Sequence, residues 1–153
     1  MNITQLLSPA STLVCNKVSS KKKVLEKVSE IMSDSIDCTA KCIFESLLSR
    51  EKLGTTALGE GIAIPHGRVA SCSQPTAVFI LLENGVDYGA TDKQLVDIIF
   101  AIMVPEQAHQ DHLRYLAKIA EILSNKPIAS QIRHAHSSEA LYQILEQAAK
   151  KIE

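Results

Sequence analysis

Two long apolar runs near the middle of the chain constrain its possible folds most strongly. The first is TAVFILLE at 76–83, and the second is LVDIIFAIMVP at 95–105. Both are nearly continuously apolar and rich in β-branched or aromatic residues, which is typical of strands buried on both faces. Between the runs, Asn84-Gly85 is a strong turn dipeptide and predicts a reversal of the chain.

Helical patterns flank these runs in sequence. A capping Ser20 followed by apolar residues at helical spacing predicts a helix to about residue 32, and a second helix should follow Asp37 and end near Gly54. Two shorter patterns predict helices at 128–134 and at about 138–150, the last one capped by Ser137 or Ser138. A further helix after Pro105, stopped by Asn125 and Pro127, has an inner face formed by Leu113, Leu116, Ile119, Ala120 and Leu123.

This order of elements predicts one α/β domain with helices packed on both sides of buried strands. The 153 residues suffice for one sizeable core and are few for two. We see no repeat, linker or low-complexity segment, so we expect a single domain over 1–153 with an ordered core at about 20–150.

Composition excludes several functions. The formal net charge is -1, from 16 basic and 17 acidic side chains, and tryptophan is absent, so we expect no nucleic-acid partner. No stretch reaches the roughly 18 apolar residues of a spanning helix, and the N-terminus lacks the features of a signal peptide. The four cysteines lack metal or framework spacing. We therefore expect a cytoplasmic protein with reduced thiols that is not embedded in a membrane.

One histidine stands in an unusual local context, GEGIAIPHGR at 59–68. Pro65 fixes its own φ, and glycine at 67 tolerates torsions that other residues avoid, so we expect a sharply defined loop that presents His66 at a strand end. Gly59 and Gly61 add open backbone that could offer N–H groups to an anion, although a lone GxG is weak evidence. An ordinary surface histidine in a turn is the alternative interpretation.

The segment LGTTALGEGIAIPHGR resembles the phosphorylation-site segment of mannitol/fructose-type enzyme IIA domains of the bacterial phosphotransferase system. More narrowly, it is similar to the nitrogen-type enzyme IIA. QLVDIIFAIMVPEQAHQDHLRYLAKIAEIL resembles the second diagnostic stretch of the family, and SSEALYQIL matches its final helix. The resemblance covers nearly the whole chain from about residue 20 and implies a mixed β-sheet sandwiched by α-helices.

The resemblance also implies roles for individual residues. His66 falls on the phosphorylated histidine, for which the family uses Nε2, His112 falls on the second active-site histidine, and Arg50 matches a nearby arginine. Imidazole is partly neutral near its ordinary pKa of roughly 6.5 and can act as a nucleophile. His112 and Arg50 would stabilise charge on the phosphoryl group. Glu60 and Arg68 stand where relatives often have Asn and Lys, and Glu60 receives no role. The resemblance implies no cofactor and no metal.

The implied partner is a small phosphocarrier similar to the histidine carrier protein HPr, in its nitrogen-type form. The protein would be a phosphorylated intermediate rather than a free-standing enzyme, and its phosphorylation state would regulate targets such as potassium transport components or sensor kinases. A phosphoryl group adds roughly -1.5 to -2 charges, enough to switch docking off by repulsion and desolvation.

Three alternatives remain open. A sugar-type enzyme IIA would pass its phosphate to a separate IIB chain, because no IIB domain or membrane segment follows by Glu153. A pure binding module would use the surface around the histidine without phosphorylation. A zinc-dependent enzyme is the third, although HEXXH is absent. Its candidate ligands are His66, His109, Asp111, His112, His134 and His136.

Overall fold

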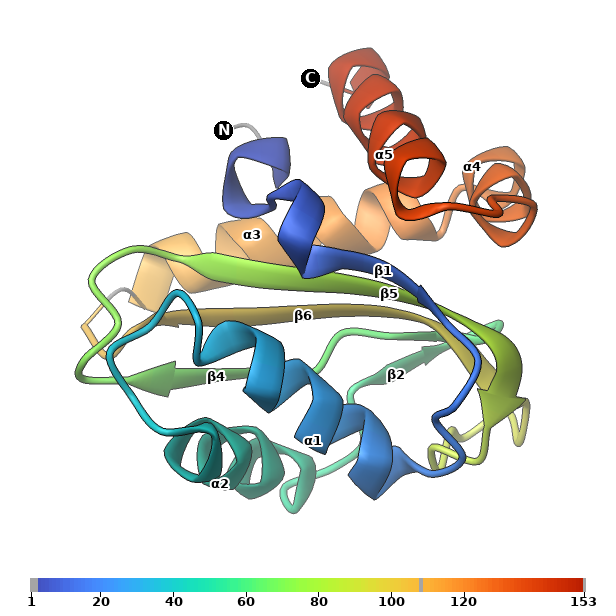
Figure 1. Cartoon of the computed structure of the whole chain (residues 1–153). Helices are drawn as coiled ribbons and strands as arrows, with labels where there is room; N and C mark the ends of the chain where they lie inside the picture. Colours follow the sequence, from blue (N-terminus) through green and yellow to red (C-terminus); the bar gives the residue numbers. More distant parts are fainter. Residues whose placement is uncertain (1–2, 108, 153) are drawn as a thin grey trace.

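Six strands form one mixed sheet with helices on both of its faces (Figure 1). The computed structural model describes residues 3–107 and 109–152, and within these ranges the side chains of His109, Asp111 and Ile152 lie outside the description. The strands are β1 (Thr12–Cys15), β2 (Ala57–Gly59), β3 (Ile62–Ala63), β4 (His66–Val69), β5 (Thr76–Val86) and β6 (Val96–Pro105). The helices are α1 (Lys21–Met32), α2 (Ala40–Glu51), α3 (His109–Leu123), α4 (Lys126–Arg133) and α5 (Ser138–Ile152), preceded by two 3-10 turns at Ile3–Leu6 and Pro9–Ser11. The mixed α/β fold expected from the sequence is therefore confirmed.

The centre of the sheet is the antiparallel pair β5 and β6, which the two apolar runs form. Successive side chains of a strand point to opposite faces, so both faces of this pair must be covered. Phe79 and Phe100 are paired in register, and their ring centroids are 5.6 Å apart on one face. Ile80 and Ile99, one position further along, are paired and buried on the other. The prediction of doubly buried strands is confirmed.

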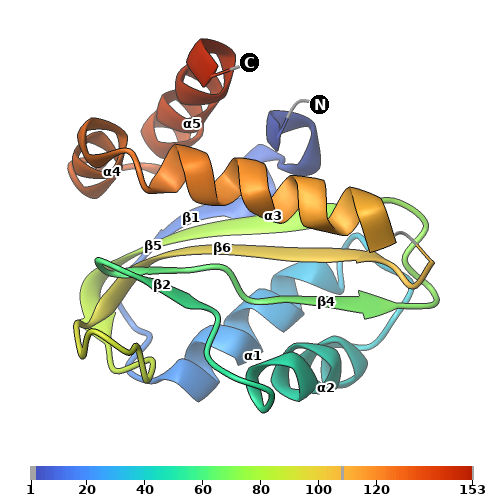
Figure 2. The ribbon, with the colours of Figure 1, turned by 180° about the vertical axis from the view of Figure 1, so that it is seen from behind.

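Two helical layers cover the sheet. Helices α3, α4 and α5 lie with the N-terminal 3-10 turns on one face, and α1 and α2 lie on the other (Figures 1 and 2). The sheet order is β1-β5-β6-β3-β2, and β4 also pairs with β6. Both β3 and β4 run parallel to β6 on the same side, β3 beside Ile98 and Ile99 and β4 beside Ile102–Pro105. The chain between β3 and β4 is therefore held against the central strand.

The predicted helix starts are close to the observed ones, because capping side chains mark them. Ser20 Oγ accepts a hydrogen bond from the Lys23 amide at the start of α1. Ser137 accepts in the same way at the start of α5. Asn125, which was expected only to stop the preceding helix, also caps the start of α4. Pro127 lies in the first turn of α4, where a backbone N–H has no partner within the helix and its absence costs nothing. Pro127 therefore belongs to the start of α4 as well as lying after the end of α3.

The expected turn at Asn84-Gly85 is wrong. Both residues lie inside β5, where the pairing with β6 shifts between Leu81 and Val86, and the chain reverses only after the strand ends. A Cβ on Gly85 would lie 2.9 Å from Leu95 Cβ. Glycine is required at this position by the close approach of Leu95 rather than by a turn.

Two other expectations differ from the structure. Leu113, assigned to the inner face of α3, is 67% exposed, because the first turn of that helix borders an open cleft instead of the core. The ordered part was expected from about residue 20, but β1 precedes it and pairs in parallel with β5. Ile3 is also buried in the core on the α5 side of the sheet. No helix among the described residues is long and apolar enough to span a membrane.

Candidate functional site

His66 follows a short interruption in the strand that runs along β6. The Ile64 amide donates to the Thr56 carbonyl at 3.1 Å, and the Pro65 carbonyl accepts from the Ile102 amide at 3.0 Å. Pro65 has no N–H of its own, so the ladder of hydrogen bonds is broken between β3 and β4. The Ile64 carbonyl is thereby left to a side chain, and it lies 2.8 Å from His66 Nδ1.

The glycine after the histidine serves close packing. Gly67 does not have a positive φ, so the expectation that it adopts a torsion other residues avoid is wrong. A Cβ at this position would lie 2.5 Å from Ser46 Oγ and 3.4 Å from both the Ser46 carbonyl carbon and Met103 Cε. Gly67 therefore allows α2 to approach β4 closely.

Hydrogen bonds define the tautomer of His66. Arginine only donates, and Arg50 Nε–H points at His66 Nε2 over 3.2 Å. Nε2 must therefore be the unprotonated nitrogen, and Nδ1–H donates to the Ile64 carbonyl. Burial lowers the pKa of His66 below its ordinary value, and the Arg50 charge adds to this, against the raising effects of the Ile64 carbonyl and Glu51. His66 is thus a neutral imidazole with a lone pair on Nε2 at pH 7.

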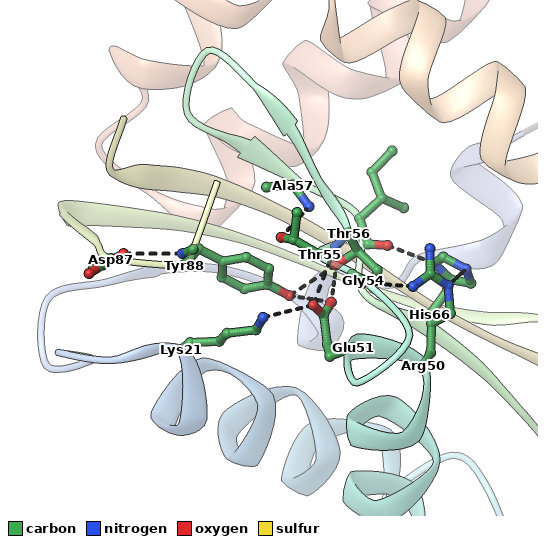
Figure 3. A network of polar contacts seen from close by, with 12 residues as sticks. Lys21, Arg50, Glu51, Gly54, Thr55, Thr56, Ala57, His66, Asp87 and Tyr88 are labelled. Atoms are coloured by element: carbon green, nitrogen blue, oxygen red, sulfur yellow. Dashed lines mark hydrogen bonds and ion pairs between the residues drawn. The ribbon is translucent and has the colours of Figure 1, made fainter. Parts of the chain in front are cut away.

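Arg50 reaches the histidine from the last turn of α2. Its Nη1 donates to the Gly54 carbonyl at 2.8 Å, which holds the guanidinium across the end of the helix (Figure 3). A planar guanidinium held in this way keeps other N–H groups free to face an anion. Arg50 is half-buried, so its charge is partly shielded from solvent.

His112 approaches from the opposite helical layer. It lies in the first turn of α3, and its ring centroid is 4.9 Å from that of His66, with the ring planes inclined by 55°. Both histidines line an open cleft of about 500 Å³. The other lining residues are Ser46, Ser49, Arg50, Leu53, Gly67, Arg68 and Leu113. The structure therefore brings together all three residues for which the sequence implied a role, from β4, α3 and α2.

The glycines upstream do not form an anion cradle at this cleft. Gly59, Glu60 and Gly61 all have positive φ and make the tight turn between β2 and β3. The Glu60 amide donates to Asp92 Oδ2 at 2.8 Å, and its carbonyl accepts from Arg133 Nη2 at 2.7 Å. The backbone groups of Glu60 already have partners, and none of Gly59, Glu60 and Gly61 is among the residues that line the cleft.

The zinc alternative gains no support from the part of the chain that is described. There, no three side chains of His, Cys, Asp or Glu converge in a way that could hold a metal ion. His134 and His136 are exposed and do not line the cleft, and His134 Nδ1 lies 2.7 Å from the Ser130 carbonyl. The side chains of His109 and Asp111 lie outside the described residues.

A buried polar network beside the site was missed by the sequence analysis. The carboxylate of Glu51, 2% exposed, accepts hydrogen bonds from Tyr88 Oη and from the amide and hydroxyl of Thr56, and it pairs with Lys21 Nζ (Figure 3). Burial and the Glu51 charge both raise the pKa of Tyr88, so its hydroxyl remains a donor. A charged residue at a helix end is usually solvated, and no local pattern marks Glu51 as buried.

Comparison with known proteins agrees with this architecture. The chain is 40% identical over 146 residues to a nitrogen regulatory protein of Pseudomonas aeruginosa and 39% identical over 145 residues to one of Bradyrhizobium diazoefficiens, with 95% of each chain covered in both cases. The crystal structure of nitrogen regulatory protein IIA-Ntr from Neisseria meningitidis superimposes with a TM-score of 0.88 at 37% identity, over 94% of this chain and 98% of that one.

A more distant solved structure shares the fold. The mannitol IIA of Escherichia coli superimposes with a TM-score of 0.75 at 21% identity, over 91% of this chain and 98% of that one. The family model described as "Phosphoenolpyruvate-dependent sugar phosphotransferase system, EIIA 2" matches residues 5–148. The chain therefore belongs to the EIIA 2 family of the phosphotransferase system, among relatives named nitrogen regulatory proteins.

Proposed function

We propose that His66 carries a phosphoryl group on Nε2 and that the protein regulates partners according to whether this group is present. The observation that supports the proposal most directly is the tautomer of His66. The Ile64 carbonyl holds the proton on Nδ1, so the Nε2 lone pair faces the cleft beside Arg50 and His112. The family match over 5–148 supports treating 1–153 as one enzyme IIA domain that acts in the cytoplasm.

The transfer step uses this arrangement directly. The donor is a small carrier protein similar to HPr that bears a phosphohistidine. The His66 Nε2 lone pair attacks phosphorus, and the phosphorus–nitrogen bond of the donor breaks with its electron pair returning to the donor imidazole. His66 keeps its Nδ1 proton throughout, because the Ile64 carbonyl accepts it at 2.8 Å. No base is needed on this side of the reaction, which suits a transfer governed by positioning and charge.

Arg50 and His112 supply the charge stabilisation. As phosphorus approaches, Arg50 Nε–H exchanges its bond to His66 Nε2 for one to a phosphoryl oxygen, while Nη1 stays on the Gly54 carbonyl. His112, with its ring centroid 4.9 Å from that of His66, is close enough to donate to another oxygen. It also stands in the first turn of α3, where the partial positive charge of the helix favours an anion.

The rim of the cleft suits a protein donor. Leu53, just after α2, is 85% exposed, and Leu113, on α3, is 67% exposed; both line the cleft that holds the two histidines. Exposed apolar residues beside a reactive group are typical of a docking surface. Phosphorylation adds roughly -1.5 to -2 charges within this surface, so regulatory targets would bind the two states differently. Potassium transport components and sensor kinases are candidate targets.

Intact mass spectrometry of the protein mixed with a phosphoenolpyruvate-driven donor pair tests the proposal. The wild-type chain should gain one phosphoryl group, and His66→Ala should gain none. His134→Ala is the matched control, because this histidine is exposed and away from the cleft, and it should be phosphorylated like the wild type. His112→Ala should still be phosphorylated, but at a lower rate. A phosphoryl group on the His66→Ala variant would refute the proposal, and transfer from the labelled protein to a separate IIB chain would identify the sugar-type alternative.

A further inference from the structure

The carboxylate of Glu51 is almost fully buried, which calls for an explanation. It accepts from Lys21 Nζ at 2.8 Å, the Thr56 amide at 3.2 Å, Tyr88 Oη at 2.9 Å and the Thr56 hydroxyl. Lys21 Nζ also lies 4.6 Å from the centre of the Tyr88 ring. Burying a carboxylate of this kind costs several kcal/mol before its partners offset the cost, and its charged partner Lys21 is only partly buried. Well-packed apolar side chains of similar volume are often at least as stabilising as a buried ion pair, so a role for the network beyond stability is worth testing.

The network joins parts of the chain that are far apart in sequence. Lys21 is the first residue of α1, Glu51 ends α2, Thr56 precedes β2, and Tyr88 follows β5. Tyr88 is 37 positions from Glu51 and is fully buried. The other three meet around the Glu51 carboxylate, which therefore fixes the segment 50–56 relative to the sheet (Figure 3).

Two chains of hydrogen bonds connect segment 50–56 to His66. On the first route, the Thr56 carbonyl accepts from the Ile64 amide at 3.1 Å, and the carbonyl of the same Ile64 residue accepts from His66 Nδ1 at 2.8 Å. On the second, the Gly54 carbonyl accepts from Arg50 Nη1 at 2.8 Å, and Arg50 Nε donates to His66 Nε2 at 3.2 Å. Both ring nitrogens are therefore held by groups whose positions depend on this segment.

We propose that Glu51 is a positioning residue for His66: by fixing segment 50–56 through Thr56, Tyr88 and Lys21, it holds the imidazole in the tautomer with Nε2 unprotonated. It also keeps the Arg50 guanidinium facing that nitrogen. Glu51 itself touches neither the cleft nor the phosphoryl group, since its carboxylate is buried and occupied on both oxygens. The effect on transfer rests on the proposed phosphorylation of His66, whereas the effect on the tautomer does not.

Nitrogen-15 NMR of the two His66 ring nitrogens in Glu51→Gln tests the proposal, because it reports the tautomer without any phosphoryl donor. Asp97→Asn is the matched control. Asp97 is also a carboxylate held by a basic side chain, with Arg133 Nε at 3.0 Å, but it makes none of the bonds that lead to His66. Tyr88→Phe and Thr56→Val each remove one hydroxyl donor to Glu51 with little change of shape, and they serve as milder variants if Glu51→Gln does not fold.

The wild-type protein and Asp97→Asn should show one neutral tautomer, protonated on Nδ1. In Glu51→Gln the two nitrogens should exchange between both tautomers, and to a smaller extent in the milder variants. Transfer from the phosphorylated carrier should lose about tenfold in kcat, with little change in KM, because misplacement of reacting groups affects the chemical step and leaves the docking rim intact.

A single unchanged tautomer in a folded Glu51→Gln protein, or in both milder variants, would refute the positioning role. A lower free energy of unfolding with no change in tautomer or kcat would make the network purely structural, which also overturns the inference. Absence of phosphorylation in the wild-type protein would overturn the proposed function, and the NMR result would still decide the role of Glu51.

Discussion

Replacing Gly67 by alanine tests whether the close approach of α2 to β4 sets the geometry of the cleft. The added Cβ would lie 2.5 Å from Ser46 Oγ and 3.4 Å from the Ser46 carbonyl carbon. Rotating the hydroxyl away would break its 3.0 Å hydrogen bond to the Arg68 carbonyl, a net loss of about 1 kcal/mol. Shifting the helix instead is overpacking, which costs about 1–3 kcal/mol.

Alanine also reduces the conformational entropy of the unfolded chain, which returns about 0.5 kcal/mol. We therefore expect Gly67→Ala to lower the free energy of unfolding by about 1–2 kcal/mol, measured by urea titration. Phosphoryl acceptance should slow as well, because the same helix carries Arg50 to within 3.2 Å of His66 Nε2.

A double-mutant cycle with Ser46→Ala separates this contact from other effects. Removing the Ser46 hydroxyl eliminates the atom that the new Cβ would meet at 2.5 Å, so part of the cost of Gly67→Ala should disappear in the double variant. The coupling between the two sites should be about 1 kcal/mol in favour of the double variant. Additive effects, or wild-type stability of Gly67→Ala, would show that close packing is not the reason for glycine here.

Two further predictions concern the site. The pKa of His66 measured by NMR should lie below 6.5, and Arg50→Met should raise it, because one of the charges that disfavour the imidazolium is then lost. In the unfolded chain His66 should have its ordinary pKa of about 6.5, and in the folded chain a lower one. Between these two pKa values the unfolded chain binds a proton that the folded chain does not, so His66 should make the protein less stable as the pH falls from about 6.5 through the folded-state pKa. A His66 pKa above 6.5 in the wild-type protein would contradict the predicted lowering of the pKa and the predicted pH dependence of stability. Leu53→Gln and Leu113→Gln should leave the free energy of unfolding within about 0.5 kcal/mol of the wild type, since both side chains are exposed, but should raise KM for the phosphorylated carrier. A large loss of stability would mean that Leu113 packs into the core as its helical spacing suggested.

Local patterns in the sequence were sufficient for the two central strands and most helix boundaries, but not for the four shorter strands of the sheet. The two apolar runs can be satisfied only by strands covered on both faces, because every second side chain points to the opposite side. Capping residues such as Ser20 and Ser137 mark helix starts through bonds that span three residues, and such bonds depend little on the rest of the fold. His66 also stood out locally, from its proline and glycine neighbours.

The structural role of several residues that stood out in the sequence depends on tertiary contacts. Gly67 and Gly85 were interpreted from local torsional preference, yet both are required by side chains that approach from elsewhere, Ser46 on α2 and Leu95 before β6. Leu113 has the spacing of a core residue, but the helix turn that carries it lies beside the cleft. Close approach and burial depend on two surfaces that meet in the fold. A periodic pattern in the sequence describes only one of those two surfaces.

The amino-acid sequence alone therefore indicated a sheet covered by helices and a histidine at the end of one of its strands. Only folding decided that an arginine from one layer and a second imidazole from the other would converge on it, with Nε2 left unprotonated. It also decided that Glu51 would be buried against Tyr88, 37 positions away. The physical reason is that the state of an ionisable group depends on the desolvation and hydrogen-bond partners it meets in three dimensions, and those partners come from distant parts of the sequence.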